Sequence, residues 1–486
     1  MNGVSPGFYA RVRTWADGDG RVREDTSPPE RWMQQIWRHQ RIHRGQLRTL
    51  DGETVRILHP GFWNREAGPD FRDAVVQIGT GPARRGDVEL DRAVDGWRSH
   101  RHEGNPRYLG VILHVVWTAP AAVVSPPVLL LKPYLDAPLA ELATWLESEA
   151  PGLLPGNLPG TCCAPLRDLA PEQFRELLHQ AARIRLQRKA SEFAARARQA
   201  GWEQALWEGV FTALGYKHNG WPMRRLAELV VPDDSHAFHG SDPVPTDSER
   251  IPVLEWEARL LGLSGLLPPQ LPSGAARGVV RRLWDLWWRE RDAWGEQVLP
   301  PFVWRLSGVR PANHPQRRII LAARLRAHGG LSGALQAWLT GRPGRMESVA
   351  ELHQILSPPA EPEDYWLRHA TLRSQTSRDP MPLLGLARLT ELAMNAVLPW
   401  LLARALAGGR EDLPGEIEKR YFAWPAADDN AGLRLARQRL LGDSVQPVPW
   451  TGAMQQGLHQ ILCDFCLRSG PLCEACQFPA AIRSLG

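Results

Sequence analysis

Lysine is almost absent from this chain of 486 residues. Only four of its 58 basic residues are lysines, and the others are arginines. We interpret this bias as the codon usage of a GC-rich genome, although the planar guanidinium group also suits phosphate binding. The formal net charge of +5 is small for this length. The charge therefore neither requires nor excludes a nucleic-acid partner.

Long apolar runs are also missing. No stretch of about 18 apolar residues occurs, so we expect no membrane helix. The segment MNGVSPGFYARVRTW does not join a basic region to an apolar core, so we predict no secretory signal and a cytoplasmic location. Thiols stay reduced in that compartment. The six cysteines are therefore expected to be metal ligands or core residues rather than disulfides.

The length is that of two or three domains. Short strand-like runs come first, a segment rich in proline and glycine follows, and helical periodicity then dominates, most clearly in 174–200 and 202–214. We predict four parts, which are an α/β (or α+β) domain at 1–150, a linker at 151–166, a helical region at 167–450 and a cysteine-rich tail at 451–486.

The first domain shows a helix followed by several strands. Glu30–Trp37 is predicted to be a helix because its apolar residues recur on one face. Asp51-Gly52 predicts a hairpin turn between strands at 46–50 and 54–58. The further predicted strands are Phe71–Ile78, Gly86–Leu90, Val111–Trp117 and Val128–Leu131. Helices beside a mostly buried sheet are typical of an α/β or α+β domain.

Four cysteines near the C-terminus follow the pattern C-x2-C-x6-C-x2-C, and they are Cys463, Cys466, Cys473 and Cys476. Four thiolates form a closed tetrahedral site for Zn²⁺, which predicts a structural zinc. An iron–sulfur cluster is the main alternative, and four reduced thiols without metal are the third interpretation. We interpret the adjacent Cys162 and Cys163 as structural, because neighbouring cysteines rarely chelate one metal together.

Two carboxylates are placed to meet in the first domain. Asp70 follows Gly68-Pro69 at the start of one predicted strand, and Glu89 lies inside the next. Adjacent strands lie ~4.8 Å apart, so both side chains can reach one cation. Mg²⁺ is usually held by one or two carboxylates with water and substrate phosphate. The structural alternative is that Asp70 caps a turn while Glu89 pairs with an arginine such as Arg84 or Arg85.

This layout resembles the PD-(D/E)xK nuclease superfamily. In that pattern a Pro-Asp on one strand precedes Glu-x-Lys on the next, and an earlier helix often supplies another glutamate. Pro69-Asp70, Glu89 and Glu30 match these elements. The resemblance implies cleavage of nucleic-acid phosphodiesters that depends on Mg²⁺ or Mn²⁺. The sequence departs from the pattern at Asp91, which occupies the lysine position.

Four residues are candidates to replace that lysine. Lys132 is the first lysine in the chain and ends a predicted strand. His100 and His102 are two residues apart, so on a strand they share a face and would join the carboxylates around a transition metal. A solvated turn is the other interpretation of these two histidines. His114 is interpreted more readily as a hydrogen-bonded core residue than as a ligand.

The whole chain is similar to a bacterial family known as domain of unknown function 2851. The motifs that carry this resemblance include Leu47–Gly52, Ala67–Phe71, Gly86–Glu89, Trp97 with His100 and His102, Val111–Val116, Gly215–Asn219, Arg310–Asn313, Asn395–Pro399 and Cys466 with Cys473 and Cys476. The family pattern tends to have three C-terminal cysteines. It brings no established activity, so the resemblance groups residues without adding a reaction.

Three hypotheses follow for function. The first is a metal-dependent nuclease in which Asp70 and Glu89 hold the ion, Glu30 assists and the arginine-rich helices bind the nucleic-acid backbone. The second is a non-catalytic scaffold with a degenerate nuclease-like domain and a structural zinc site. The third is a hydrolase of another substrate class that uses the same carboxylates and histidines with a transition metal.

Overall fold

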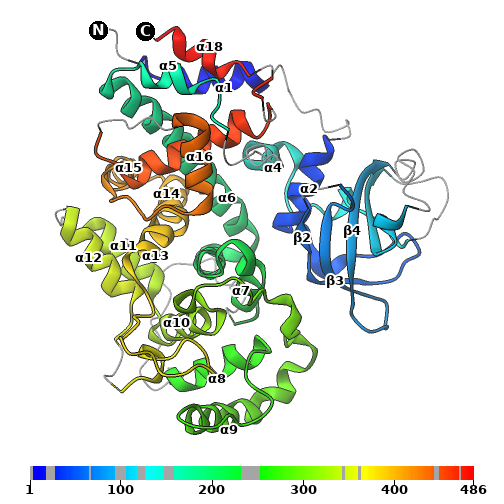
Figure 1. Ribbon diagram of the computed structural model, residues 1–486. Coiled ribbons are helices and arrows are strands. Elements are labelled where there is room, and N and C mark those ends of the chain that lie inside the picture. Colours follow the sequence, from blue (N-terminus) through cyan, green and yellow to red (C-terminus); the bar gives the residue numbers. More distant parts are fainter. Residues whose placement is uncertain are drawn as a thin grey trace. The chain divides into compact units, whose positions relative to one another are not determined.

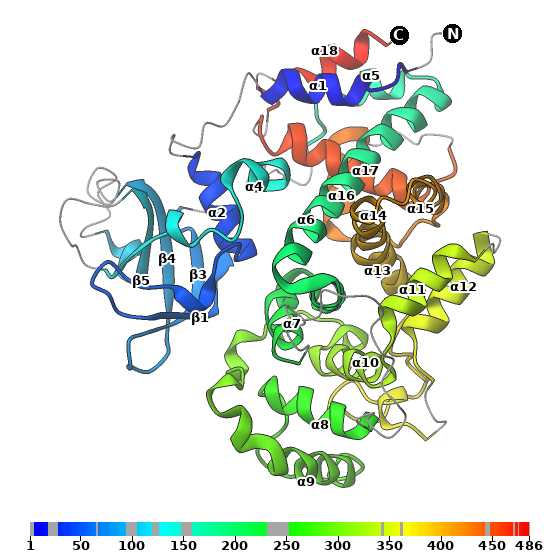
Figure 2. The same ribbon diagram turned by 180° about the vertical axis from the view of Figure 1, so that it is seen from behind.

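The computed structural model describes most of the chain, namely residues 4–17, 28–64, 67–93, 105–118, 126–146, 158–230, 252–341, 345–359, 363–442, 448–469, 472–474 and 476–485. The described residues form two compact units. The first combines Met1–Ser191 with Asp429–Gly486, and the second is Glu192–Asp428. Each unit is described by itself below (Figures 1 and 2).

A six-stranded mixed sheet forms the centre of the N-terminal part. Its strands are β1 (Val55–His59), β2 (Phe62–Trp63), β3 (Phe71–Ile78), β4 (Arg84–Ala93), β5 (Val111–Thr118) and β6 (Val128–Leu130). The order is β1-β3-β4-β5-β6, with β2 also paired to β3. The pairs among β1–β4 are antiparallel, whereas β4–β5 and β5–β6 are parallel. The middle of the sheet is therefore β4.

One face of this sheet carries the main core of the N-terminal part. Val88 and Leu90 of β4 point to that face together with Leu113 and Val115 of β5. Helix α2 (Glu30–His39) packs there through its apolar residues, and α4 (Leu139–Leu146) lies beside it (Figures 1 and 2). Residues alternate between faces along a strand, so Glu89 and Asp91 belong to the opposite face.

A second core in the first unit joins distant parts of the sequence. It is built from α1 (Phe8–Asp17), α5 (Cys163–Arg167), the first part of α6 (Pro171–Leu214), α16 (Ala431–Leu441), α17 (Gly452–Ile461), a π-helical turn (Leu462–Cys466) and α18 (Phe478–Arg483). Tyr9 of α1 packs edge-on against Phe465, with ring centroids 6.1 Å apart. Residues 158–166, inside the predicted linker, contribute Cys162 and Leu166 to this core.

The second unit is helical. Its helices are the rest of α6, then α7 (Tyr216–Val230), α8 (Val253–Leu263), α9 (Ala276–Trp294), α10 (Pro315–His328), α11 (Leu331–Thr340), α12 (Arg345–Leu356), α13 (Leu386–Leu392), α14 (Leu398–Ala407) and α15 (Leu413–Ala423). Helix α6 is interrupted at Gly201, whose φ of 80° favours glycine. The predicted helical stretches at 174–200 and 202–214 are confirmed as the two parts of α6.

The coarse fold prediction is confirmed, because an N-terminal mixed sheet precedes a mostly helical remainder. The first predicted strand, 46–50, is wrong in detail. This segment contains a 3-10 turn and two isolated bridges, Arg48 to Thr54 and Thr49 to Leu129, because it pairs with two different partners. Among the described helices, none has the length and apolar character needed to span a bilayer.

Candidate active site

Asp70 and Glu89 are directly opposite each other on two antiparallel strands. The register pairs Phe71 of β3 with Val88 of β4, which sets the two acidic residues side by side. The Asp70 backbone N–H donates to Glu89 Oε2 at 3.0 Å, and the Leu90 backbone N–H donates to Asp70 Oδ2 at 3.0 Å. Each carboxylate is thus fixed by the backbone of the strand that bears the other.

The turn before Asp70 holds it in place. Gly68 has a φ of 125°, a conformation that residues with a Cβ rarely adopt. Asn64 closes the turn, since its side-chain amide donates to the Pro69 carbonyl at 2.9 Å and its backbone N–H donates to the Asp70 carbonyl at 2.6 Å. The motif Gly68-Pro69-Asp70 therefore aims the carboxylate by local geometry.

Helix α2 adds a glutamine and a glutamate to the pair. Gln34 Nε2 donates to Asp70 Oδ1 at 2.7 Å and to Glu30 Oε1 at 3.2 Å. Glu30 is the first residue of the helix, where a negative charge is favourable. The buried Gln34 thus links the helix glutamate to the strand aspartate.

Asp91 brings a fourth carboxylate to this face. The parallel register places Glu89 beside His114 and Asp91 beside Val116. His114 Nε2 lies 2.9 Å from Asp91 Oδ2, and both side chains are buried. His114 is therefore a hydrogen-bonded core residue, as the sequence predicted. The position at which the nuclease pattern has a lysine carries a carboxylate tied to an imidazole.

Mutual repulsion shapes the protonation of this cluster. Burial, followed by the charges of Glu30 and Asp91, raises the pKa of Asp70 to about 8. Burial and the charge of Asp70 raise the pKa of Glu89 to about 9. Burial and the charges of Glu89, Asp70 and Asp91 raise the pKa of Tyr108 to about 12. Five side chains therefore share one electrostatic environment. We call them the carboxylate cluster, and they are Glu30, Asp70, Glu89, Asp91 and Tyr108.

We expect the stability of the cation-free protein to fall as pH rises from about 7 to about 8. Between its ordinary value near 4 and its raised value, each carboxyl binds more protons in the folded than in the unfolded state, so stability declines with pH. Thermal unfolding at several pH values measures this slope. Glu89→Gln is expected to reduce this slope, and saturating Mn²⁺ is expected to bring it close to zero, because the cation keeps both carboxyls deprotonated in the folded state. Identical slopes for both proteins would contradict this account.

A divalent cation at this site would be bound by two protein carboxylates, those of Asp70 and Glu89. No group of three or more histidine, cysteine, aspartate or glutamate side chains is arranged to hold a metal ion in the part of the chain that the structure describes. Mg²⁺ needs fewer protein ligands, because water and substrate phosphate complete its shell. Asp70 and Glu89, two carboxylates whose pKa values are both raised by burial and by neighbouring negative charge, supply the oxygen donors that such an ion prefers.

The candidates for the missing lysine lie elsewhere or are not described. Lys132 is exposed and lines a cavity of about 450 Å³ with Trp117 and Asp136. Trp117 belongs to the core face, opposite to that of Asp91. The structure therefore does not bring Lys132 to the carboxylate cluster. His100 and His102 lie outside the described residues.

Arg85, one of the two arginines named in the structural alternative for Glu89, pairs with a different carboxylate. Arg85 Nη2 pairs with Asp73 Oδ1 at 2.9 Å, and both side chains are half-exposed.

In the helical unit, Asn219 donates to the Arg305 carbonyl at 2.9 Å and accepts from the Arg305 backbone N–H at 2.8 Å. The polar groups of Asn219 therefore join two segments of the second unit.

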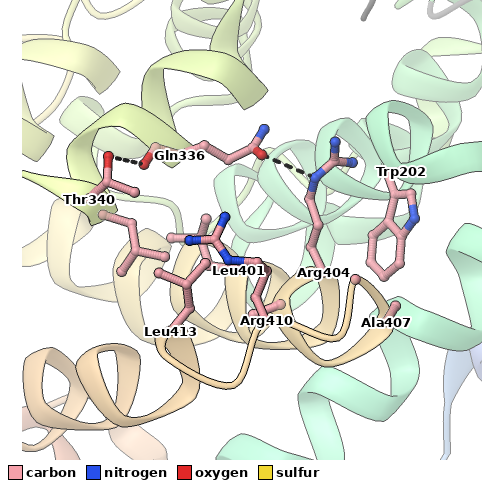
Figure 3. A pocket seen from close by; sticks show the side chains of 11 residues that line it. Trp202, Gln336, Thr340, Leu401, Arg404, Ala407, Arg410 and Leu413 are labelled. Carbon is pink, nitrogen blue, oxygen red and sulfur yellow. Dashed lines mark hydrogen bonds between the residues drawn. The ribbon is translucent and has the colours of Figure 1, made fainter. Parts of the chain in front are cut away.

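The second unit contains a cavity of about 380 Å³ (Figure 3). Trp202, Arg404 and Arg410 are among its lining residues. The Arg404 Nε–H donates to Gln336 Oε1 at 3.3 Å, and Arg410 pairs with Asp412 at 2.9 Å. Guanidinium groups with an indole suit an anion or a flat ring. Both arginines already have protein partners, so the carboxylate cluster is the stronger candidate site.

Sequence reasoning missed Gln34 and Tyr108. Gln34 lies one helical turn after Glu30, so its spacing places it on the same side of the helix. That spacing was the available signal. Tyr108 is brought close by the segment before β5, and nothing in its local sequence indicates this.

Of the predicted cysteine ligands, Cys466 is buried in the second core of the first unit, and Cys476 packs against that core. Cys463 and Cys466 fall in the π-helical turn, Cys473 has a φ of 57° and Cys476 precedes α18.

A family model described as "Protein of unknown function (DUF2851)" matches residues 30–425. This range contains Glu30, Asp70, Glu89 and Asp91. No curated protein and no solved structure matches the chain.

Proposed function

We propose that the N-terminal sheet domain of this chain, which belongs to the DUF2851 family, cleaves nucleic-acid phosphodiesters with the help of a divalent cation. The observation that carries this proposal is the cross-strand pair of Asp70 and Glu89, with Glu30 linked to it through Gln34. Helix glutamate, strand aspartate and next-strand glutamate are the three acidic elements of the PD-(D/E)xK pattern.

Asp70 and Glu89 would hold Mg²⁺ or Mn²⁺. When bound, such an ion polarises the phosphate and lowers the pKa of water. The backbone N–H of Leu90 and the amide of Gln34 keep Asp70 oriented in the absence of substrate. Because both carboxyls have raised pKa values, cation binding near neutral pH releases protons from them.

The residues around the pair suggest how a phosphate is received. Tyr108 is half-buried beside the carboxylates, and its hydroxyl stays protonated at neutral pH because burial and neighbouring charge raise its pKa. A protonated hydroxyl donates a hydrogen bond to a phosphate oxygen. Arg107 precedes it, is exposed and supplies a positive charge near Tyr108. We assign substrate contact to these two residues.

The test is cleavage of labelled oligonucleotides by the full-length protein. Single-stranded DNA, double-stranded DNA and RNA are each incubated with Mg²⁺, Mn²⁺ or a chelator. We expect cleavage of at least one substrate with a cation and none with the chelator. Calorimetric titration with Mn²⁺ accompanies the assay.

The scaffold hypothesis predicts a different result in both measurements. Asp91 occupies the lysine position and is bonded to His114, so a domain that has lost its chemistry would neither bind Mn²⁺ at this cluster nor cleave. Cleavage that persists in the chelator would contradict the cation requirement. A protein that binds Mn²⁺ but cleaves no nucleic acid would point to the hydrolase of another substrate class.

A further inference from the structure

A buried arginine in the second core of the first unit is surrounded by thiols. Arg439 of α16 is fully buried. Its Nη2 donates to Cys473 Sγ at 3.1 Å, and its carbonyl accepts from Cys163 Sγ at 3.3 Å. Its charge also lowers the pKa of Cys466 and Cys476 against the opposing effect of burial. One guanidinium-bearing residue is thus close to Cys163 and to cysteines of the C-terminal segment, which lie about 300 residues further along the chain.

Cys162 joins this group through a glycine turn. The Gly160 backbone N–H donates to the Arg439 carbonyl at 2.7 Å, and the Cys163 N–H donates to the Gly160 carbonyl at 3.1 Å. A Cβ on Gly160 would lie 3.4 Å from Cys473 Sγ and 3.5 Å from Cys162 Sγ. The two sulfurs are therefore no more than 6.9 Å apart, the sum of those distances.

The remaining thiols complete the group. Cys162 and Cys466 are buried in the same core, and Cys476 packs against it. Burial raises the pKa of Cys162, and the charges of Cys466, of its neighbour Cys163, and of Cys476 and Cys473 raise it further. One cysteine from the segment before α5 and three from the C-terminal segment thus lie near one another, although in the described residues their side chains are not yet turned toward a common point as the ligands of an ion.

Cys463 belongs to a different environment. It precedes Asp464, whose carboxylate accepts from the Tyr9 hydroxyl at 2.7 Å and from Gln460 at 2.9 Å. The charge of Cys463 raises the pKa of that same Tyr9. The Leu467 N–H donates to the Leu462 carbonyl at 3.0 Å, a π-helical bond that spans five residues. Cys463 therefore lies near the Tyr9–Asp464 pair, whereas Cys466 lies near Cys162.

We infer that Cys162, Cys466, Cys473 and Cys476 form one metal centre of four thiolates, in place of the set that contains Cys463. The class of cofactor is a soft metal bound by sulfur, either Zn²⁺ or an iron–sulfur cluster. Each Cys must lose its proton to bind, and the Arg439 guanidinium offsets part of the negative charge that results. The centre joins the segment before α5 to the chain's last helix and so acts as a structural staple.

The test compares Cys162→Ser with Cys463→Ser in the full-length protein, purified without oxygen and analysed for zinc, iron and acid-labile sulfide. We expect about one centre per wild-type chain, at least about tenfold less metal in Cys162→Ser, and wild-type content in Cys463→Ser. Iron with sulfide identifies a cluster, and zinc alone identifies a zinc site. Loss of metal from Cys463→Ser with retention in Cys162→Ser would overturn the inference.

A measurement on the wild type covers the case in which Cys162→Ser does not fold. The native protein is alkylated with iodoacetamide before and after treatment with a chelator, and each cysteine is read by mass spectrometry. Cys162, Cys466, Cys473 and Cys476 are expected to become reactive together after chelation, while Cys463 does not change. A wild-type protein that holds neither metal after reconstitution with Zn²⁺, or with Fe²⁺ and sulfide, would also overturn the inference.

Discussion

Replacing Asp70 by asparagine is expected to lower cation-dependent cleavage by about a thousandfold or more. The substitution removes one of the two charges that would hold the ion but keeps the shape of the side chain. The amide oxygen of the new side chain can still accept from the Leu90 backbone N–H, as Oδ2 of Asp70 does at 3.0 Å. Its NH2 group replaces Oδ1, which accepts from Gln34 Nε2, so the Gln34 amide must turn and present its oxygen as the acceptor. The loss therefore falls on the chemistry rather than on the fold, and initial cleavage rates at saturating Mn²⁺ measure it.

The same variant is expected to be at least as stable as the wild type without cation above about pH 8, where Asp70 ionises. The charges of Glu30 and Asp91 oppose that ionisation, so an uncharged side chain relieves the repulsion in this range. Thermal unfolding with and without Mn²⁺ should show that the cation stabilises the wild type and has no effect on Asp70→Asn. A variant that no longer cleaves because it has unfolded would show a lowered transition temperature, and this readout separates the two causes.

Asp73→Asn is the matched control. Asp73 lies on the same strand, but its side chain is half-exposed and pairs with Arg85. Its φ of 58° suits asparagine, which tolerates this conformation better than most residues. We expect cleavage and Mn²⁺ stabilisation close to those of the wild type. Equal losses in the two variants would mean that the carboxylate cluster is not the site of the reaction.

Elements that depend on neighbouring residues alone could be predicted from the sequence. Strand β3 has the predicted bounds, Phe71–Ile78, because a run of apolar and β-branched residues follows a Gly-Pro turn. Helix α2 begins at Glu30 as predicted, just after two prolines that suit a helix start. Glycine at 201 divides α6 because a positive φ is needed there.

Elements that depend on strand order or on distant packing could not be predicted. Asp91 meets His114 only because β4 and β5 are parallel neighbours, and the spacing along the chain does not state which strands pair. The predicted end of β4 at Leu90 is also too early, since pairing with β5 extends it to Ala93. Cys162 and Cys473 lie near each other because Gly160 and Cys473 both contact Arg439 of α16. The residues next to each cysteine in the sequence do not indicate this contact.

The candidate site shows both kinds of residue. Asp70, Glu89 and Glu30 were predicted because each follows a local element boundary or a motif spacing. Gln34 was not predicted, although its spacing from Glu30 places both side chains on one side of α2, because its contact with Asp70 also depends on how α2 packs against the sheet. A motif therefore identifies the charged residues of such a site, and only the packed structure identifies the neutral residue that orients them.

Replacing Arg324 by methionine is expected to destabilise the helical unit by about 3–5 kcal/mol, the usual cost of breaking a buried charge pair. Arg324 of α10 donates from Nε to Glu257 of α8 at 2.7 Å, and its terminal nitrogens bind both oxygens of Asp364. All three side chains are at most 9% exposed. Methionine fills similar space but leaves two buried carboxylates uncompensated. Urea or thermal unfolding followed by tryptophan fluorescence measures the loss.

The pH dependence of this loss distinguishes charge from packing. Burial already raises the pKa of Glu257, and the Arg324 charge opposes that rise. Without the arginine, the folded-state pKa moves further up, so the folded protein gains stability as pH falls and the carboxyls take up protons. The destabilisation should therefore be smaller near pH 5 than near pH 8.

Arg410→Met is the matched control, because the Arg410–Asp412 pair has similar geometry but is exposed, and we expect no measurable change. A loss for Arg324→Met that is the same at both pH values would assign its role to packing alone.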